Sequence, residues 1–258
     1  MLIADTHVHV YPAHDTRALF ISAWQNLKQF ARGNQNFHAG LFLTERAGDF
    51  YFRNLAAGKL PPPQGFRTAP CSETGVLIVE QPDQEIRFWV FAGRQIVPKE
   101  KIEVHCLAAD ADIPDGLSAA ETVSAIRNAG GIPVIPWSPG KWLFKRGKTV
   151  RDLIDNRNGR PLIMGDTSMR PCGFPRPSLL RHALRNGIPV IAGSDPLPFA
   201  GDEAVAGKYF IAATAFDPAM PLTSARALIN NGNFISGGRR DSPVTALYRW
   251  LKNRNAGA

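Results

Sequence analysis

The chain has 258 residues, 44% of them hydrophobic, and a formal net charge of +8. This size and apolar content suit a single packed α/β domain, while three widely separated cysteines argue against a disulfide framework and favour a reducing, cytoplasmic compartment. No run of about 18 apolar residues indicates a membrane span, and no nucleic-acid-binding motif accompanies the basic charge. We therefore expect a small anionic partner rather than a membrane or nucleic acid, and composition leaves the oligomeric state open.

The first strand is predicted over residues 2–10, and it ends in polar side chains. Asp5, His7 and His9 alternate with other residues and therefore share one face of the strand. Two neutral imidazoles spaced two positions apart can bind one cation, such as Zn, Fe or Mn. The stretch therefore predicts a metal site. The alternative is that both imidazoles are satisfied by hydrogen bonds or face solvent.

The following elements are short and change in character along the chain. Apolar spacing predicts a helix over residues 14–32, capped by Asp15 or Thr16, then a strand over 40–44 and a helical segment up to Gly58. Residues 75–80 and 85–92 predict an antiparallel hairpin, and residues 94–97 and 101–108 predict a second one. We therefore expect antiparallel hairpin segments in the middle of the chain.

From residue 112 onward, strands and helices alternate. A capping box formed by Ser118 and Glu121 opens a helix over residues 118–128. Strands are predicted over 132–136, 161–164 and 188–192, and helices over 150–156 and 178–186. This order predicts a barrel-like parallel sheet. Residues 203–258 carry helical patterns at 224–230 and 243–253, so we expect a C-terminal helical extension packed on one domain that spans residues 1–258.

Polar residues that follow apolar runs are the best candidates for chemistry, because α/β barrels gather their active sites at the C-terminal ends of strands. Asp195 follows such a run and can ligate a cation or accept a proton from bound water; the alternative is a turn-capping role before Pro196. His105, with Glu103 on the same strand face, can act as a third ligand or a general base, or as a hydrogen-bonded core residue. The other residues in such positions are Arg46, Trp137, Ser138 and Asp166.

Five segments share their order and approximate spacing with the motifs of one enzyme family. They are DTHVHVYPAHD at 5–15, FLTERAGD at 42–49, AGRQIVPKEKIEVHCLAA at 92–109, GGIPVIPWSPG at 130–140 and GIPVIAGSDPLP at 187–198. Together they resemble the PHP (polymerase and histidinol phosphatase) family of metal-dependent phosphoesterases. The resemblance implies a distorted TIM-like (β/α)7 barrel with two or three metal ions that hydrolyses phosphate esters.

The chain departs from this family at several metal-ligand positions. Arg46 stands where the second motif has His, and Gln95 stands where a bridging Glu is expected. Leu197 stands where the last His is expected. A fourth falls on Trp137 or Ser138, where another His is expected. The ligands that remain are His7, His9, Asp195 and His105, which suffice for one divalent ion, Zn, Mn or Fe, with open positions for water and substrate.

Charged side chains near this reduced site suggest how a substrate is held. Arg46 in place of a ligand repels a second cation and offers a bidentate clamp for phosphate or carboxylate. Lys141, after the SPG turn, adds a second positive group. Glu73 is a candidate for the missing bridging carboxylate. These residues predict a small anionic, phosphorylated substrate.

Three functions are compatible with these residues. We predict a metal-dependent phosphoesterase in which Arg46 stabilises developing negative charge and His105 or Asp195 transfers protons. One alternative, favoured by the four substitutions, is a catalytically impaired PHP-like protein that binds a ligand or partner. The other is an amidohydrolase-type enzyme, because DTHVHVYP and GSDPLP are also similar to that superfamily. The central hairpins and the absence of His at 137 and 138 count against it.

Overall fold

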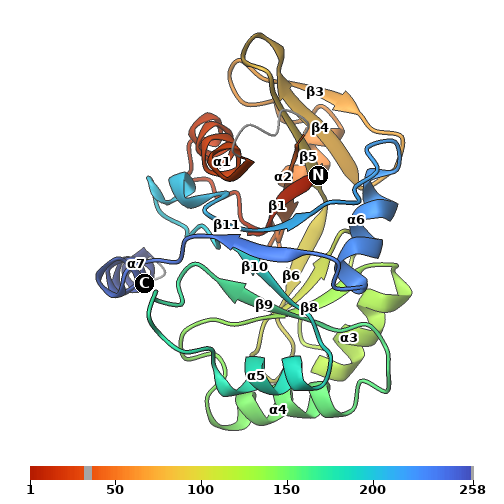
Figure 1. The fold of residues 1–258 in the computed structure, drawn as a ribbon, viewed down its shortest axis with the longest axis vertical. Coiled ribbons are helices and arrows are strands. Elements are labelled where there is room, and N and C mark those ends of the chain that lie inside the picture. Colours follow the sequence, from red (N-terminus) through yellow and green to blue (C-terminus); the bar gives the residue numbers. More distant parts are fainter. Residues whose placement is uncertain (32–36, 257–258) are drawn as a thin grey trace.

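The computed structural model describes residues 1–31 and 37–256, and it shows a mixed α/β fold with two sheets (Figure 1). The first sheet has the strand order β12-β11-β1-β2-β5-β4-β3 and the second has the order β10-β9-β8-β7-β6. The first sheet contains β1 (Leu2–Val8), β2 (His38–Leu43), β3 (Arg67–Pro70), β4 (Val76–Gln81), β5 (Ile86–Phe91), β11 (Tyr209–Ala213) and β12 (Ile235–Gly238). The second contains β6 (Gly93–Ile96), β7 (Val104–Leu107), β8 (Ile132–Pro136), β9 (Ile163–Thr167) and β10 (Val190–Gly193).

Seven α-helices and two short 3-10 helices are assigned within the described residues. The α-helices are α1 (Thr16–Ala31), α2 (Tyr51–Ala56), α3 (Ala119–Asn128), α4 (Phe144–Asp155), α5 (Ser178–Arg185), α6 (Pro221–Asn230) and α7 (Pro243–Ala256), and the 3-10 helices are η1 (Pro82–Gln84) and η2 (Asp202–Val205). Arg32, the last residue of the predicted first helix, lies outside the described residues. None of the described helices combines the length and apolar composition that crossing a bilayer requires.

Local sequence signals gave most of these elements correctly. The capping box at Ser118 is formed, with its hydroxyl accepting from the Glu121 N–H, and Asp15 accepts the Ala18 N–H at the start of α1. Both predicted hairpins pair antiparallel, β4 with β5 and β6 with β7. Strands β8, β9 and β10 pair in parallel, as the alternating pattern indicates. Strand β3 was not predicted.

The predicted closed barrel is not formed as one continuous sheet within the described residues. Strand β2 pairs in parallel with β5, and the same register continues only as an isolated bridge between Glu45 and Arg94. The chain leaves the first sheet between β5 and β6, so β5 pairs with β4 while β6 pairs with β7. The break at this point divides the strands into two sheets.

The helical extension predicted over residues 203–258 is also wrong in part. Helices α6 and α7 are present, but β11 and β12 lie between η2 and α7 and add to the first sheet beside β1. The apolar run of β11 is only five residues long. Periodicity does not distinguish a strand from other structure in so short a run. Pairing with β1, far away in sequence, decides its conformation.

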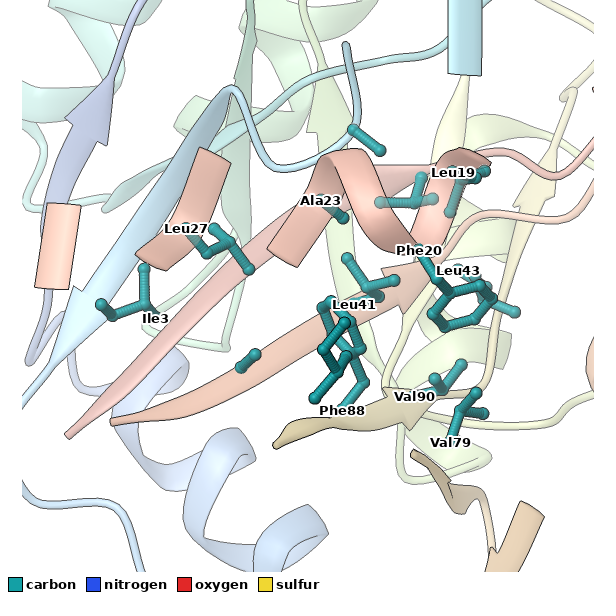
Figure 2. Close-up of a cluster of buried hydrophobic side chains, with 14 of the residues drawn as sticks. Ile3, Leu19, Phe20, Ala23, Leu27, Leu41, Leu43, Val79, Phe88 and Val90 are labelled. Carbon is teal, nitrogen blue, oxygen red and sulfur yellow. The ribbon is translucent and has the colours of Figure 1, made fainter. Parts of the chain in front are cut away.

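The hydrophobic core of the described residues has three large clusters and a small fourth one of Met169, Leu197 and Phe199. Helix α1 packs on the first sheet, and Figure 2 shows Leu19, Ala23 and Leu27 lying over Ile3 and Leu41. A second cluster, which includes Leu2 of β1 and Ile163 of β9, fills the space between the two sheets. A third lies between the outer face of the second sheet and helices α3, α4 and α5 (Figure 1). Each fully buried aliphatic side chain contributes about 1.5–3 kcal/mol to folding.

Helix α7 is fixed by one buried guanidinium. Arg249 donates to both carboxylate oxygens of Asp202 at 2.9 and 2.7 Å, to Asp241 Oδ2 at 2.6 Å and to Ser168 Oγ at 3.1 Å. It also donates to the backbone carbonyl of Asp195 at 2.8 Å. Arg249, Asp202 and Asp241 are all buried. The last helix is therefore tied to the end of β10 through a satisfied polar network.

We predict that Arg249→Met destabilises the protein by about 3–5 kcal/mol, because it leaves the buried Asp202 carboxylate without its counter-charge. Urea unfolding followed by circular dichroism measures this free energy. The control is Arg254→Met on the same helix, where the exposed guanidinium lies 4.9 Å from the Trp250 ring and is worth no more than about 1 kcal/mol. Equal stability of the two variants would contradict the role given to Arg249.

Candidate metal centre

Two histidines and one aspartate from opposite ends of the chain converge where the two sheets meet. The Nε2 atoms of His7 and His9 lie 3.1 Å apart, and Asp195 Oδ1 lies 3.3 Å from His7 Nε2 and 3.8 Å from His9 Nε2. All three residues are buried, and one ligand atom from each falls within 4.8 Å of the others. The sequence predicted these three residues as metal ligands, and the structure places them together.

The backbone of β10 holds Asp195 against β1. The Asp195 N–H donates to the His7 carbonyl at 2.9 Å, and Asp195 has a left-handed φ of 56°, a conformation that Asp tolerates better than most residues. Gly193 allows this approach, because a Cβ at this position would lie 2.3 Å from His7 Cβ. The carboxylate consequently faces the imidazoles rather than a turn before Pro196.

Asp5 shares the polar end of β1 but has a different role from the two histidines. Its carboxylate accepts the backbone N–H groups of His7 at 3.1 Å, Ser194 at 2.9 Å and Gly207 at 2.8 Å. Burial raises the pKa of Asp5 to about 7, against the lowering effect of these donors. A register shift in β1 between Asp5 and Val8 separates Asp5 from the regular alternation. Asp5 therefore braces the backbone around the centre.

Burial keeps both imidazoles neutral. Desolvation lowers the pKa of His7 to about 4, although the Glu103 charge opposes this shift, and lowers the pKa of His9 to about 3. Burial raises the pKa of Asp195, against the lowering effect of His9. Neutral imidazoles expose the lone pairs that a metal ion needs.

His105 lies beside this cluster on β7. Its ring centroid is 4.4 Å from that of His7, with the planes at 74°, and its side chain is almost completely buried. Burial lowers the pKa of His105 well below its usual value. Its Nε2 atom has no hydrogen-bond partner among the described residues, which is costly for a buried polar atom. This unpartnered nitrogen fits a fourth ligand or a proton acceptor, and it disfavours the alternative of a hydrogen-bonded core histidine.

The donor set fits a divalent transition metal. Two neutral imidazoles and a carboxylate, with a third imidazole beside them, are ligands that suit Zn, Mn or Fe. Such a set leaves positions for water and substrate. The chemistry of the residues therefore agrees with a centre for a divalent metal.

The predicted anion-binding residues lie near the centre but already have partners. The Arg46 guanidinium carbon lies 4.5 Å from the centroid of the Tyr11 ring, and Arg46 Nε donates to Asp49 at 3.2 Å. Lys141 Nζ donates to Glu103 Oε1 at 2.8 Å. The Arg46 side chain is 45% exposed and that of Lys141 is 40% exposed. Both are open to an anion that arrives from solvent.

Tyr11 is a residue of this region that sequence reasoning missed. Its ring stacks on His9 with centroids 5.2 Å apart and the planes at 23°, and it also contacts the Arg46 guanidinium. Burial raises the pKa of Tyr11 well above its usual value, so the hydroxyl keeps its proton. Its position directly after the alternating polar residues of the first strand was the available signal.

Glu73 was predicted to replace a bridging carboxylate, and this is wrong. Its carboxylate accepts the N–H groups of Leu222 at 2.6 Å and Thr223 at 3.1 Å, so it caps the first turn of α6.

Leu197 is buried and its carbonyl accepts a hydrogen bond from His14 Nε2 at 2.8 Å. His14 is thus a structural residue of the loop after β1.

Comparison with known proteins finds similar folds but does not assign the chain to a family. No known family model matches the sequence, and no curated protein is significantly similar to it. PsfC from Pseudomonas syringae is similar in structure, with a TM-score of 0.55, 14% identity and coverage of 98% of both chains. The lesion-specific endonuclease PfuEndoQ from Pyrococcus furiosus gives a TM-score of 0.54 and 12% identity, covering 92% of this chain and 58% of the endonuclease.

A third similar structure carries the name of the family that the sequence motifs resemble. It is a two-domain protein from Bacteroides vulgatus that contains a predicted PHP-like metal-dependent phosphoesterase, with a TM-score of 0.50, 10% identity and coverage of 98% of this chain and 69% of that protein. Identities this low establish similarity of fold alone. The chain thus has an α/β fold similar to that of a protein with a PHP-like domain.

Proposed function

We propose that this protein is a metal-dependent hydrolase that cleaves phosphate esters with a single divalent ion, Zn, Mn or Fe. The observation that carries the proposal is the convergence of His7, His9 and Asp195, whose ligand atoms lie within 4.8 Å of one another. His105, whose Nε2 has no partner among the described residues, lies beside this group and is the proposed fourth ligand or proton acceptor. An ion bound there supplies Lewis acidity toward the phosphoryl oxygens and the attacking water.

The residues around the ligands bind and orient the substrate. Arg46 exchanges its contact with Asp49 for the phosphate and stabilises the charge that develops during hydrolysis. Lys141, held by Glu103, provides a second positive charge at the mouth of the site. His105 or Asp195 accepts a proton from the attacking water, because burial raises the pKa of Asp195 and the Nε2 atom of His105 has no partner among the described residues.

The fold proposed for this function is a single distorted barrel of the PHP type over residues 1–258. The bridge between Glu45 and Arg94 joins β2 to the edge of β6, and the Asp195 to His7 hydrogen bond joins β10 to β1. These two links support the proposal that β1, β2 and β6 to β10 surround the candidate metal centre. Similarity to the structure with a PHP-like domain supports this reading.

A small phosphorylated compound in the cytoplasm is the proposed substrate, and nucleic acid is the second class to test. One structural neighbour is an endonuclease, and the net charge of +8 suits both classes of anion. Phosphate monoesters, phosphodiesters and duplex DNA therefore belong in one substrate screen. Hydrolysis of an amide but of no phosphate ester would favour the amidohydrolase alternative.

We predict that the purified wild-type protein binds about one divalent ion per chain and that His7→Ala combined with His9→Ala abolishes this binding. Elemental analysis and titration calorimetry measure the content and affinity. His105→Ala lowers the affinity about 10- to 100-fold, whether it acts as a ligand or supports one. The control is His38→Ala, since His38 packs beside Trp89 at the beginning of β2. Wild-type protein that stays metal-free after reconstitution would favour a binding protein without this chemistry.

We predict that Arg46→Gln lowers kcat/KM for a phosphate ester about 10- to 100-fold, because hydrogen bonds to charged groups are worth about 1.5–3 kcal/mol. Metal content stays the same, which separates this loss from damage to the ligands. Arg53→Gln is the matched control, because Arg53 pairs instead with Asp110 and Asp112. Steady-state kinetics on the metal-loaded protein test the prediction, and full activity of Arg46→Gln would exclude the proposed clamp.

A further inference from the structure

A cavity of about 310 Å³ lies next to the candidate metal centre, between the loops that follow β1 and β2. We name it the aromatic cavity. Its lining includes His14, Thr16, Gly48 and Asp49, and its other six residues are Val10, Tyr11, Pro12, Phe50, Tyr51 and Leu60. Three of these six side chains are aromatic and the other three are aliphatic. Ligand cavities of proteins start at about this volume and have predominantly apolar walls.

The aromatic cavity and the metal centre share one wall. Tyr11 lines the cavity, and its ring stacks on the imidazole of His9 with centroids 5.2 Å apart. The guanidinium of Arg46 lies 4.5 Å from the same tyrosine ring. A ligand whose phosphate contacts Arg46 and the metal centre can therefore place the organic group attached to that phosphate in the cavity.

The loop that forms the outer wall is held in place. Arg94 donates to the carbonyl of Asp49 at 2.6 Å and to that of Arg46 at 3.1 Å, and its guanidinium carbon lies 5.0 Å from the Phe50 ring. Glu45 accepts the Phe52 N–H at 2.6 Å and pairs with Arg94. A wall fixed before binding costs less conformational entropy when a ligand arrives.

We propose that the aromatic cavity binds a planar aromatic group carried by the phosphate ester. This inference rests on the proposed function and names the substrate class for the same site. Aromatic walls favour a flat ring through stacked and edge contacts. The acid in the lining, Asp49, is paired with Arg46 at 3.2 Å, so its negative charge is offset where an anion would approach. The volume accommodates one or two fused rings, which excludes a long polymer segment from the cavity itself.

The test compares two phosphonates that cannot be hydrolysed, benzylphosphonate and methylphosphonate, on the zinc-loaded full chain by titration calorimetry. Benzylphosphonate replaces the ester oxygen of an aryl phosphate with a methylene, and only its ring reaches the cavity. Wild-type protein is expected to bind benzylphosphonate at least about tenfold more tightly than methylphosphonate, because burial of the ring removes apolar surface from water.

Two variants and one control assign any difference to the cavity. Leu60→Trp fills the cavity, so the ratio of the two affinities falls to about one while methylphosphonate binding is unchanged. Phe50→Ala removes a wall and lowers benzylphosphonate affinity at least about threefold, which keeps the test decisive if Leu60→Trp does not fold. The control is Leu251→Trp, on the exposed surface of α7, which keeps the wild-type ratio.

The outcomes separate this inference from the function on which it rests. Equal affinity of wild-type protein for both phosphonates overturns the aromatic cavity as a subsite and leaves the proposed hydrolase intact. An unchanged affinity ratio in both Leu60→Trp and Phe50→Ala also overturns it. Failure of both phosphonates to bind wild-type protein that holds zinc overturns the proposed function together with the subsite.

Discussion

The approach of β10 to β1 is the contact on which the rest of the site depends. The backbone hydrogen bond from Asp195 to His7 closes this contact. Asp5 reinforces it, because its carboxylate accepts the N–H of His7 on β1 and the N–H of Ser194 just after β10. Asp5 and Ser194 are 189 positions apart in the chain. The missing side chain of Gly193 is required, because any Cβ there would collide with His7. Without this contact the imidazoles and the carboxylate would not share one volume.

Burying these polar side chains destabilises the folded state, and the apolar contacts of the surrounding core offset this loss. The apolar cluster between the two sheets lies in the same interior as the histidines. Desolvation holds the imidazoles in their neutral form, so they are ready for a cation but poorly satisfied without one. The unpartnered nitrogen of His105 is the clearest sign of this imbalance. Residues that weaken folding in this way are typical of functional sites.

Local patterns were sufficient to find the candidate ligands but not to predict how the sheets are arranged around them. His7 and His9 were predictable because alternation along a strand fixes which side chains share a face, and Asp195 because it follows an apolar run. The division into two sheets was not predictable, since it depends on β5 pairing with β2 while β6 pairs with β7, a combination that local sequence patterns do not determine. Arg249 sits in a helix whose sequence shows only an amphipathic pattern, and Glu73 caps a helix about 150 residues later. Contacts of this range leave no local signal.

The dependence of Asp195 on the last helix has a consequence for biosynthesis. Its backbone carbonyl gains the Arg249 donor only after residue 249 has been translated, long after His7 and His9 have been added to the chain. Domains made of such distant pairings fold late and slowly. The nascent polypeptide therefore carries its two early imidazoles before Asp195 is fixed beside them, and the cluster reaches its final geometry only after α7 has been made.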